Sequence, residues 1–192
     1  EYVSRQEIER QLQSGAVHQG LALLVAPLDH VAIETVCNDA TDNSVIIVLD
    51  QVTDPRNIGA IMRSAIAFGA AAIVVTDKYM PETTASMAKA ASGALDRLPL
   101  VRVKNLARSL VLLKKAGFWT VGLDASADQT IARANLNGKL AIILGAEGSG
   151  LRRLTAEYCD YLVNIPIEPS AESLNVSVAA SIALYEISRN RD

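Results

Sequence analysis

The sequence has little of what stabilises or anchors several classes of protein. Its 192 residues include two cysteines, two histidines and 4% aromatic residues. The cysteines, Cys37 and Cys159, lie far apart and form no C-x-x-C motif, which argues against a disulfide framework and predicts a reducing, cytoplasmic compartment. The histidines, His18 and His30, belong to no cysteine cluster, so we expect no metal site.

Long apolar runs and an excess of positive charge are also missing. The longest apolar runs have about seven residues, against about 20 for a membrane-spanning helix, so we expect no membrane span. No basic-then-apolar leader opens the sequence. Because it begins at Glu1, we expect it to be a piece of a longer protein. The net charge of −3 argues against binding of nucleic acid through bulk positive charge.

The residues that are present describe a well-packed domain. Hydrophobic residues make up 50% of the chain and charged residues 20%, which excludes a disordered protein. A chain of this length buries about 70% of its surface on folding, enough for a core without disulfides. With so few aromatic residues, that core must consist mainly of Ala, Val, Ile and Leu, as in proteins with a buried parallel sheet.

Segments typical of strands and helices alternate along the chain. Short, β-branched apolar runs predict strands at residues 18–28, 45–50, 71–76, 98–103, 118–124, 139–145 and 161–166. Helical spacing and capping residues predict helices at residues 29–37, 57–69, 82–92, 105–117, 151–159 and 173–190. Residues 1–16 read as the end of a linker or as a short helix. The pattern predicts an α/β fold with a mainly parallel sheet flanked by helices.

Three loops that follow strands are candidate sites, because ligands bind beyond the carboxyl ends of parallel strands. The first, DQVTDPRNIGAIMRS at 50–64, places Asn57 at the mouth of a helix and Arg63 six residues later. Composition alone favours a plainer interpretation, in which Asn57 caps the helix and Arg63 is solvated. Gly59 costs about 1 kcal/mol relative to Ala inside a helix, which indicates a close backbone approach there.

The second loop, LGAEGSGL at 144–151, has glycines in the order G-x-x-G-x-G. This is neither the dinucleotide fingerprint nor a P-loop, but glycines still permit a tight turn and close approach to a ligand. Glu147 would be a charged group at a strand end or simply a solvated turn residue. Arg152 and Arg153 follow and supply local positive charge.

The third loop, within IPIEPSAESLNVSVAAS at 165–181, leads into a long predicted helix. Ser173 or Asn175 would be the N-cap of that helix or part of a site. The small residues at 177–181 would allow another element to pack closely.

Together the three segments resemble the SpoU family of RNA 2′-O-ribose methyltransferases, of the SPOUT superfamily. The stretches that correspond to its three motifs, in order, are NIGAIMRSA, LGAEGSGL and IPIEPSAESLNVSVAASIALYE. VTDPRNIGA, VKNLARSL and GAEGSGLRRLT look most like the enzymes that methylate a guanosine in bacterial 23S rRNA. Alternatives are a tRNA 2′-O-methyltransferase of the same family, a non-catalytic RNA-binding paralogue, and an ordinary Rossmann enzyme, which the missing glycine fingerprint disfavours.

The resemblance implies a fold and a set of partners. The C-terminal part would form a deep trefoil knot, a rare feature that no periodicity reveals, and would bind S-adenosylmethionine there. The protein would be a homodimer with ribosomal RNA as its substrate. Residues 41–192 would be the catalytic domain. Residues 1–40 would be a linker and the edge of that domain, and the RNA-binding domain expected upstream would lie outside this sequence.

The resemblance also implies roles for individual residues. Arg63 would clamp an RNA phosphate and lower the pKa of the ribose 2′-hydroxyl, because a guanidinium stays protonated and is a poor literal base. Glu147 would hold an Arg or Asn side chain, and Asn175 would orient its loop. The catalytic residues carried over are Asn57, Arg63, Glu147, Ser173 and Asn175. The donor-binding residues are Leu144, Gly145, Gly148, Ile165, Ile167 and Leu174. The RNA-binding residues are Arg56, Arg152 and Arg153.

Overall fold

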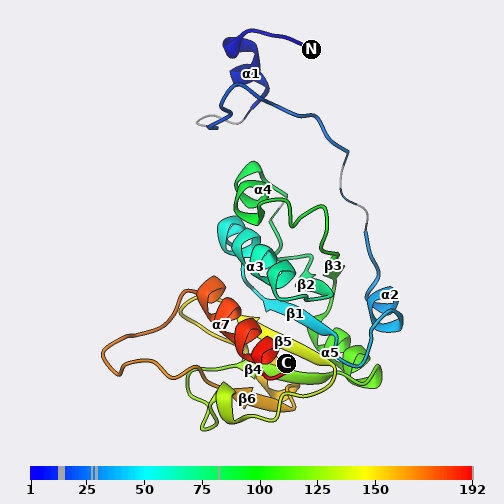
Figure 1. Ribbon diagram of the computed structural model, residues 1–192, viewed down its shortest axis with the longest axis vertical. Coiled ribbons are helices and arrows are strands. Elements are labelled where there is room, and N and C mark those ends of the chain that lie inside the picture. Colours follow the sequence, from blue (N-terminus) through cyan, green and yellow to red (C-terminus); the bar gives the residue numbers. More distant parts are fainter. Residues whose placement is uncertain (13–15, 27, 29, 82, 192) are drawn as a thin grey trace.

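A six-stranded parallel sheet lies at the centre of the computed structural model, which describes residues 1–12, 16–26, 28, 30–81 and 83–191 (Figure 1). The strand order is β3-β2-β1-β5-β4-β6, and every pairing between these strands is parallel. The strands are β1 (Val45–Asp50), β2 (Ala72–Thr76), β3 (Leu100–Val103), β4 (Trp119–Leu123), β5 (Leu140–Gly145) and β6 (Tyr161–Val163). The predicted α/β fold with a mainly parallel sheet is confirmed.

Helices cover both faces of this sheet, which explains why its strands are mostly apolar. In β1, Ile47 and Leu49 face one core, while Ile46 and Val48 face the other. The first core is closed by α3 (Pro55–Ala67), α4 (Ala85–Ala91), η1 (Ile131–Arg133) and α7 (Val176–Arg189). The second is closed by α2 (Ile33–Asn38) and α5 (Leu106–Lys115). Leu151, Tyr158 and Cys159, which flank α6 (Arg153–Glu157), pack against it.

Capping residues account for where the helices begin. Asn105 caps α5 as predicted, its side chain accepting the main-chain N–H of Arg108. Helix α3 begins earlier than predicted, because Asp54 is its N-cap and proline suits the first helical position that follows. Asn57 is therefore inside the helix and is not its cap. Helix α4 begins after its cap, Thr84, and Glu82, where this helix was predicted to start, lies outside the described residues.

The N-terminal part differs from the prediction. A short helix, α1 (Arg5–Gln11), begins at a capping box formed by Ser4 and Glu7, and Figure 1 shows it apart from the sheet. The predicted strand at 18–28 is wrong, because residues 16–26 and 28 form none. A strand needs a partner to pair its backbone groups, and the leucines and valine of this stretch are exposed. Pro27 and Asp29, expected to end this strand and to cap the next helix, lie outside the described residues.

Gly59 explains how closely two helices of the first core pack. A Cβ atom at this position would lie 2.5 Å from the carbonyl oxygen of Met87 and 2.8 Å from Cβ of Ala90. The close approach predicted from the sequence is therefore made by α4. Helix α4 is held against the first turns of α3, which begins at the candidate site.

Candidate active site

A cavity of about 230 Å³ opens at the carboxyl edge of the sheet, where β4, β5 and β6 end. Its lining includes all six residues predicted to bind the donor: Leu144, Gly145, Gly148, Ile165, Ile167 and Leu174. Glu147 and Ser173 line it as well. The second and third candidate loops, which are distant in the sequence, thus form one site.

Three predicted catalytic residues form a closed hydrogen-bonded triangle beside this cavity. Asn57 donates from Nδ2 to Oε1 of Glu147 at 2.9 Å. Asn175 donates from Nδ2 to the same oxygen at 2.7 Å and to Oδ1 of Asn57 at 3.0 Å. One residue of the triangle comes from each candidate loop. The expectation that Glu147 holds an asparagine agrees with this geometry.

Asn175 has a second role at the start of α7. Its Oδ1 accepts the main-chain N–H of Ser177 at 2.9 Å and that of Val178 at 3.4 Å, so it is the N-cap of the helix. The capping interpretation of this residue is therefore confirmed, and its part in the site stays a prediction. The cap fixes the side chain so that its amide points towards Asn57 and Glu147.

Glycines give the loop after β5 its shape. A Cβ atom on Gly145 would lie only 2.1 Å from the main-chain carbon of Gly150, because the loop folds back over Gly145. The main-chain N–H of Gly150 closes the turn by donating to the carbonyl of Ala146 at 2.9 Å. Gly148 and Gly150 have φ values of +80° and +65°, which residues with a side chain rarely adopt. The loop can therefore present its backbone to the cavity.

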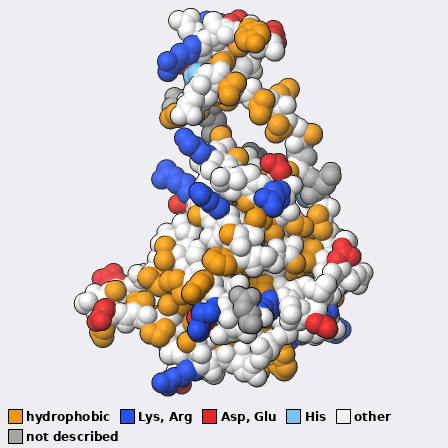
Figure 2. Space-filling view, viewed as in Figure 1, with side chains coloured by type: hydrophobic (Ala, Val, Ile, Leu, Met, Phe, Trp, Pro, Cys, Tyr) orange, Lys and Arg blue, Asp and Glu red, His pale blue; other side chains and the backbone are white. Residues whose placement is uncertain are grey.

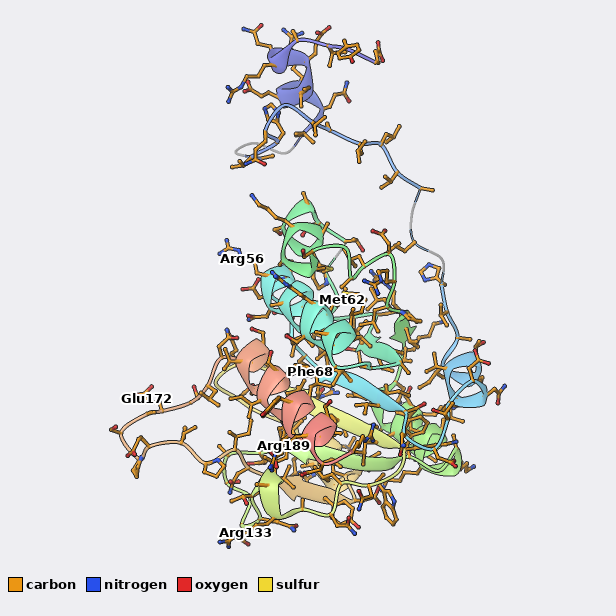
Figure 3. All side chains as sticks on the ribbon, in the orientation of Figure 1. Arg56, Met62, Phe68, Arg133, Glu172 and Arg189 are labelled. Carbon is orange, nitrogen blue, oxygen red and sulfur yellow. The ribbon has the colours of Figure 1, made fainter. Side chains whose placement is uncertain are left out.

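The predicted arginines lie outside the cavity lining. Arg63 and Arg56 are exposed on α3, and Figure 3 shows Arg56 projecting outward beside α4. Within the described part of the chain, the Arg63 side chain forms neither a hydrogen bond nor an ion pair. Arg153 pairs with Glu157 on its own helix. Arg152 instead binds the buried carboxylate of Asp50, with Nη2 2.6 Å from Oδ1.

The prediction from sequence missed one wall of the cavity. Leu123, Asp124 and Ala125 line it from the end of β4, and Glu172 contributes from the loop before α7 (Figure 3). The carboxyl-end rule applied to strand 118–124 would have found the first three. Every charged residue in the lining, namely Asp124, Glu147 and Glu172, is acidic.

Metal-ligand clusters and membrane-spanning helices are both defined by the described residues alone. In that part of the chain, no group of three or more His, Cys, Asp or Glu side chains is placed to hold a metal ion. Likewise, none of the helices found there combines the length and apolar character that crossing a membrane requires.

Residues 44–185 match the model of the SpoU rRNA Methylase family. This chain belongs to that family. It is 43% identical to the 23S rRNA (guanosine-2′-O-)-methyltransferase RlmB of Pasteurella multocida, over 100% of this chain and 79% of that protein. It is 42% identical to RlmB of Escherichia coli strain K12, over 92% of this chain and 74% of that protein.

Solved structures of SpoU proteins resemble the fold. The methyltransferase AviRb of Streptomyces viridochromogenes, in complex with its cofactor AdoMet, has a TM-score of 0.73 and 31% sequence identity. The match covers 79% of this chain and 59% of the AviRb chain, so the present sequence spans less than two thirds of that protein. The family predicted from the three motifs is confirmed.

Proposed function

We propose that this protein transfers the methyl group of S-adenosylmethionine to a ribose 2′-hydroxyl of RNA, and that the acceptor is a guanosine of 23S rRNA. The observation that carries this proposal is the cavity with apolar and acidic walls beside the triangle of Asn57, Glu147 and Asn175. The names of the RlmB relatives support the acceptor, and the AdoMet complex of AviRb supports the donor.

The cavity fits the donor by its chemistry. Leucine and isoleucine side chains and the glycine-rich backbone suit an adenine ring, which needs apolar contact and a few backbone hydrogen bonds. The three carboxylates of the lining favour a cationic sulfonium and disfavour a pyrophosphate. A nicotinamide dinucleotide, the cofactor of the Rossmann alternative, would bring two phosphates to a lining whose charged side chains are all acidic. When bound, S-adenosylmethionine supplies an electrophilic methyl group.

The acceptor hydroxyl needs to be oriented and to lose a proton. Arg63 carries an exposed guanidinium with no protein partner among the described residues, so it is available to an RNA phosphate. Its positive charge would stabilise the 2′-oxyanion as it forms, and the proton would pass to the phosphate. Methyl transfer joins the 2′-oxygen to the methyl carbon, and the electrons of the broken carbon–sulfur bond return to sulfur. The triangle of Asn57, Glu147 and Asn175 would hold the loops in place around the reacting groups. Ser173 would contact the reacting groups from the cavity wall.

The chain has a net negative charge, but its basic residues are concentrated in one region that would bind RNA. Residues 54–104 contain seven Lys or Arg and four Asp or Glu, in a chain of net charge −3. Arg56 and Arg63 are three and four residues from Gly59, so they share the helix face that carries the contact with α4. Lys89 of α4 is exposed and precedes Ala90, which touches Gly59. Figure 2 shows basic side chains gathered over α3 and α4, and this surface would bind the RNA backbone.

The homodimer belongs to the same proposal. On α7, Val178, Ile182 and Tyr185 expose 46%, 36% and 56% of their surface, and their spacing places them on one face of the helix. The small residues at 177–181, expected to let another element pack closely, include Ser181, which hydrogen-bonds Ser64 of α3 in the same chain at 2.7 Å. The apolar face of α7 would therefore bind the second copy.

The remaining expectations complete the proposal. The division into residues 1–40 and 41–192, the trefoil knot and a cytoplasmic location stay predictions. So do the RNA contacts of Arg56, Arg152 and Arg153. A tRNA acceptor is the alternative within the family, while a non-catalytic paralogue would have no need of the intact triangle.

Donor binding is tested by calorimetry with S-adenosylmethionine and with its demethylated product. We expect saturable binding of both, and no heat at millimolar ligand would refute the donor assignment. The acceptor is tested by mapping 2′-O-methylation in ribosomal and transfer RNA from cells with and without the full-length protein. Loss of one guanosine methylation in 23S rRNA supports the proposal, and loss confined to tRNA favours the alternative.

A further inference from the structure

Asp50 is a buried acidic residue, and burial of a charged group is energetically unfavourable. It is the last residue of β1, and its exposed fraction is 0%. Its carboxylate accepts two hydrogen bonds from a single residue, Arg152, one from Nε at 2.7 Å and one from the main-chain N–H at 3.3 Å. Nη2 of the same guanidinium forms an ion pair with Oδ1 at 2.6 Å. A buried carboxylate must be paired in this way, because removal from water penalises the charged form.

Asp50 contacts both ends of the loop that follows β5. The backbone of Asp50 is paired with Gly145 in the β1–β5 ladder, while its side chain binds Arg152. Both ends of the segment 145–152 are therefore attached to one residue. Between them lie Gly145, Ala146, Glu147, Gly148 and Gly150, which line the cavity.

We propose that Asp50 is a positioning residue for the donor, and that Arg152 acts inside the protein as its counterpart. This inference rests on the proposed function, because it takes the cavity to be the donor site. Asp50 does not line the cavity, so its effect must pass through the loop. The charged pair keeps the loop in the conformation in which its backbone faces the donor.

The proposal differs from the role that the family resemblance suggested for Arg152. Two of its guanidinium nitrogens are directed at Asp50, although 43% of its side chain is exposed. If Arg152 serves the donor loop, substituting it should weaken donor binding. If it serves RNA, substituting it should weaken RNA binding and leave the donor unaffected.

The test compares Asp50→Asn, Arg152→Gln and the double variant with the wild-type chain. Asparagine has the shape of aspartate, but it is neutral and offers one acceptor oxygen in place of two. We expect a rise of about tenfold or more in the donor Kd for each single variant, because the loop loses its preorganisation. The donor Kd of the double variant should be no higher than that of the single variant with the larger rise, since both changes break the same interaction. The KM for RNA at saturating donor should change by less than about threefold.

Asp160→Asn is the matched control. Asp160 also pairs with a cation, Lys114, at 2.8 Å, but it lies at the opposite end of the sheet and not in the cavity lining. We expect its donor Kd to equal that of the wild type. Circular dichroism and thermal unfolding check that each variant is folded, and Arg152→Gln carries the test if Asp50→Asn does not fold.

Hydrogen exchange of the amides at 146–151 supplies a readout that needs no ligand. Both single variants should exchange there at least tenfold faster, whereas Asp160→Asn should not. Unchanged exchange and an unchanged donor Kd in folded variants would overturn the proposal, as would a raised RNA KM with normal donor binding for Arg152→Gln. If the wild-type chain binds no donor but the loop still exchanges faster in the variants, the donor assignment fails and the anchoring by Asp50 stands.

Discussion

Asn175 donates its side-chain amide to Glu147 at 2.7 Å, while its own side-chain oxygen caps the helix that begins at the next residue. The oxygen and the nitrogen of this one side-chain amide therefore have different roles. The oxygen stabilises α7, and the nitrogen connects this helix to the loop after β5 and to α3. A substitution that changes one end and keeps the other can separate these roles.

Asn175→Asp should keep the cap and break the triangle. Aspartate caps helices about as well as asparagine, but its second oxygen would face the oxygens of Glu147 and Asn57 and repel them. We expect methyl transfer to fall by about 30-fold or more, with a loss of stability under about 1 kcal/mol. Single-turnover methylation and urea unfolding measure the two effects.

Asn105→Asp is the control for this variant. Asn105 caps α5 by accepting the N–H of Arg108 at 3.0 Å, and it does not line the cavity. The change from asparagine to aspartate at this position should leave the rate of methyl transfer unchanged. Equal losses in the two variants would mean that the triangle has no particular role.

Arg63→Ala should abolish the chemical step and spare the donor. Arg63 lies on α3 outside the cavity lining, so the donor Kd should stay within about twofold, while the rate falls by about 100-fold or more. Arg63→Lys should recover little, because an ammonium cannot replace a planar fork. Single-turnover kinetics on an RNA substrate with parallel calorimetry decide this, and a variant with more than about a tenth of the wild-type rate would show that Arg63 is misassigned.

Ile182→Glu should shift the protein from dimer to monomer. Ile182 lies between Val178 and Tyr185 on the exposed face of α7, and an unpaired charge in an apolar interface is strongly unfavourable. Sedimentation at tens of micromolar is the measurement. Leu154→Glu is the control, since Leu154 is 54% exposed on α6 at the other face of the sheet. A wild-type monomer, or a variant that remains dimeric, would rule out this interface.

The Cys159 thiol should react very slowly with alkylating reagents. Burial raises the pKa of Cys159 to about 12, so about 10⁻⁴ of it is thiolate at pH 8. Because only the thiolate reacts, the rate should rise about tenfold for each pH unit from 8 to 10. Mass spectrometry after iodoacetamide treatment measures it, with urea-unfolded protein as the reference. Labelling of folded protein at the unfolded rate at pH 8 would contradict the expectation.

Gly59→Ala should destabilise the protein although alanine is the better helix former. Helix propensity alone predicts a gain of about 1 kcal/mol, but the added methyl group would lie 2.5 Å from a main-chain oxygen of α4. Overpacking of this kind costs about 1–3 kcal/mol. Urea unfolding measures whether the free energy of unfolding rises or falls. An increase in stability would show that α4 moves away at little cost. Ala67→Ser, at an exposed position of the same helix, should change stability by less than about 0.5 kcal/mol.

Much of the fold could be predicted from local patterns. Strand 45–50 coincides with β1, and the cap at Asn105 was found because capping depends on neighbours three residues away. The strand predicted at 18–28 failed for the opposite reason. Its apolar run satisfies the local pattern, but strand formation depends on a partner that the described residues do not supply.

By itself, the sequence determined the α/β class, the three loops at strand ends and, through its motifs, the family. These depend on periodicity, capping and residue identity within short windows. Only the tertiary structure decided that Asn57 and Glu147, 90 positions apart, share a hydrogen bond, and that Arg152 reaches back to Asp50 across 102 positions. Such contacts depend on how the sheet orders its strands and where each loop turns back, and no local pattern encodes the distance between side chains that folding brings together.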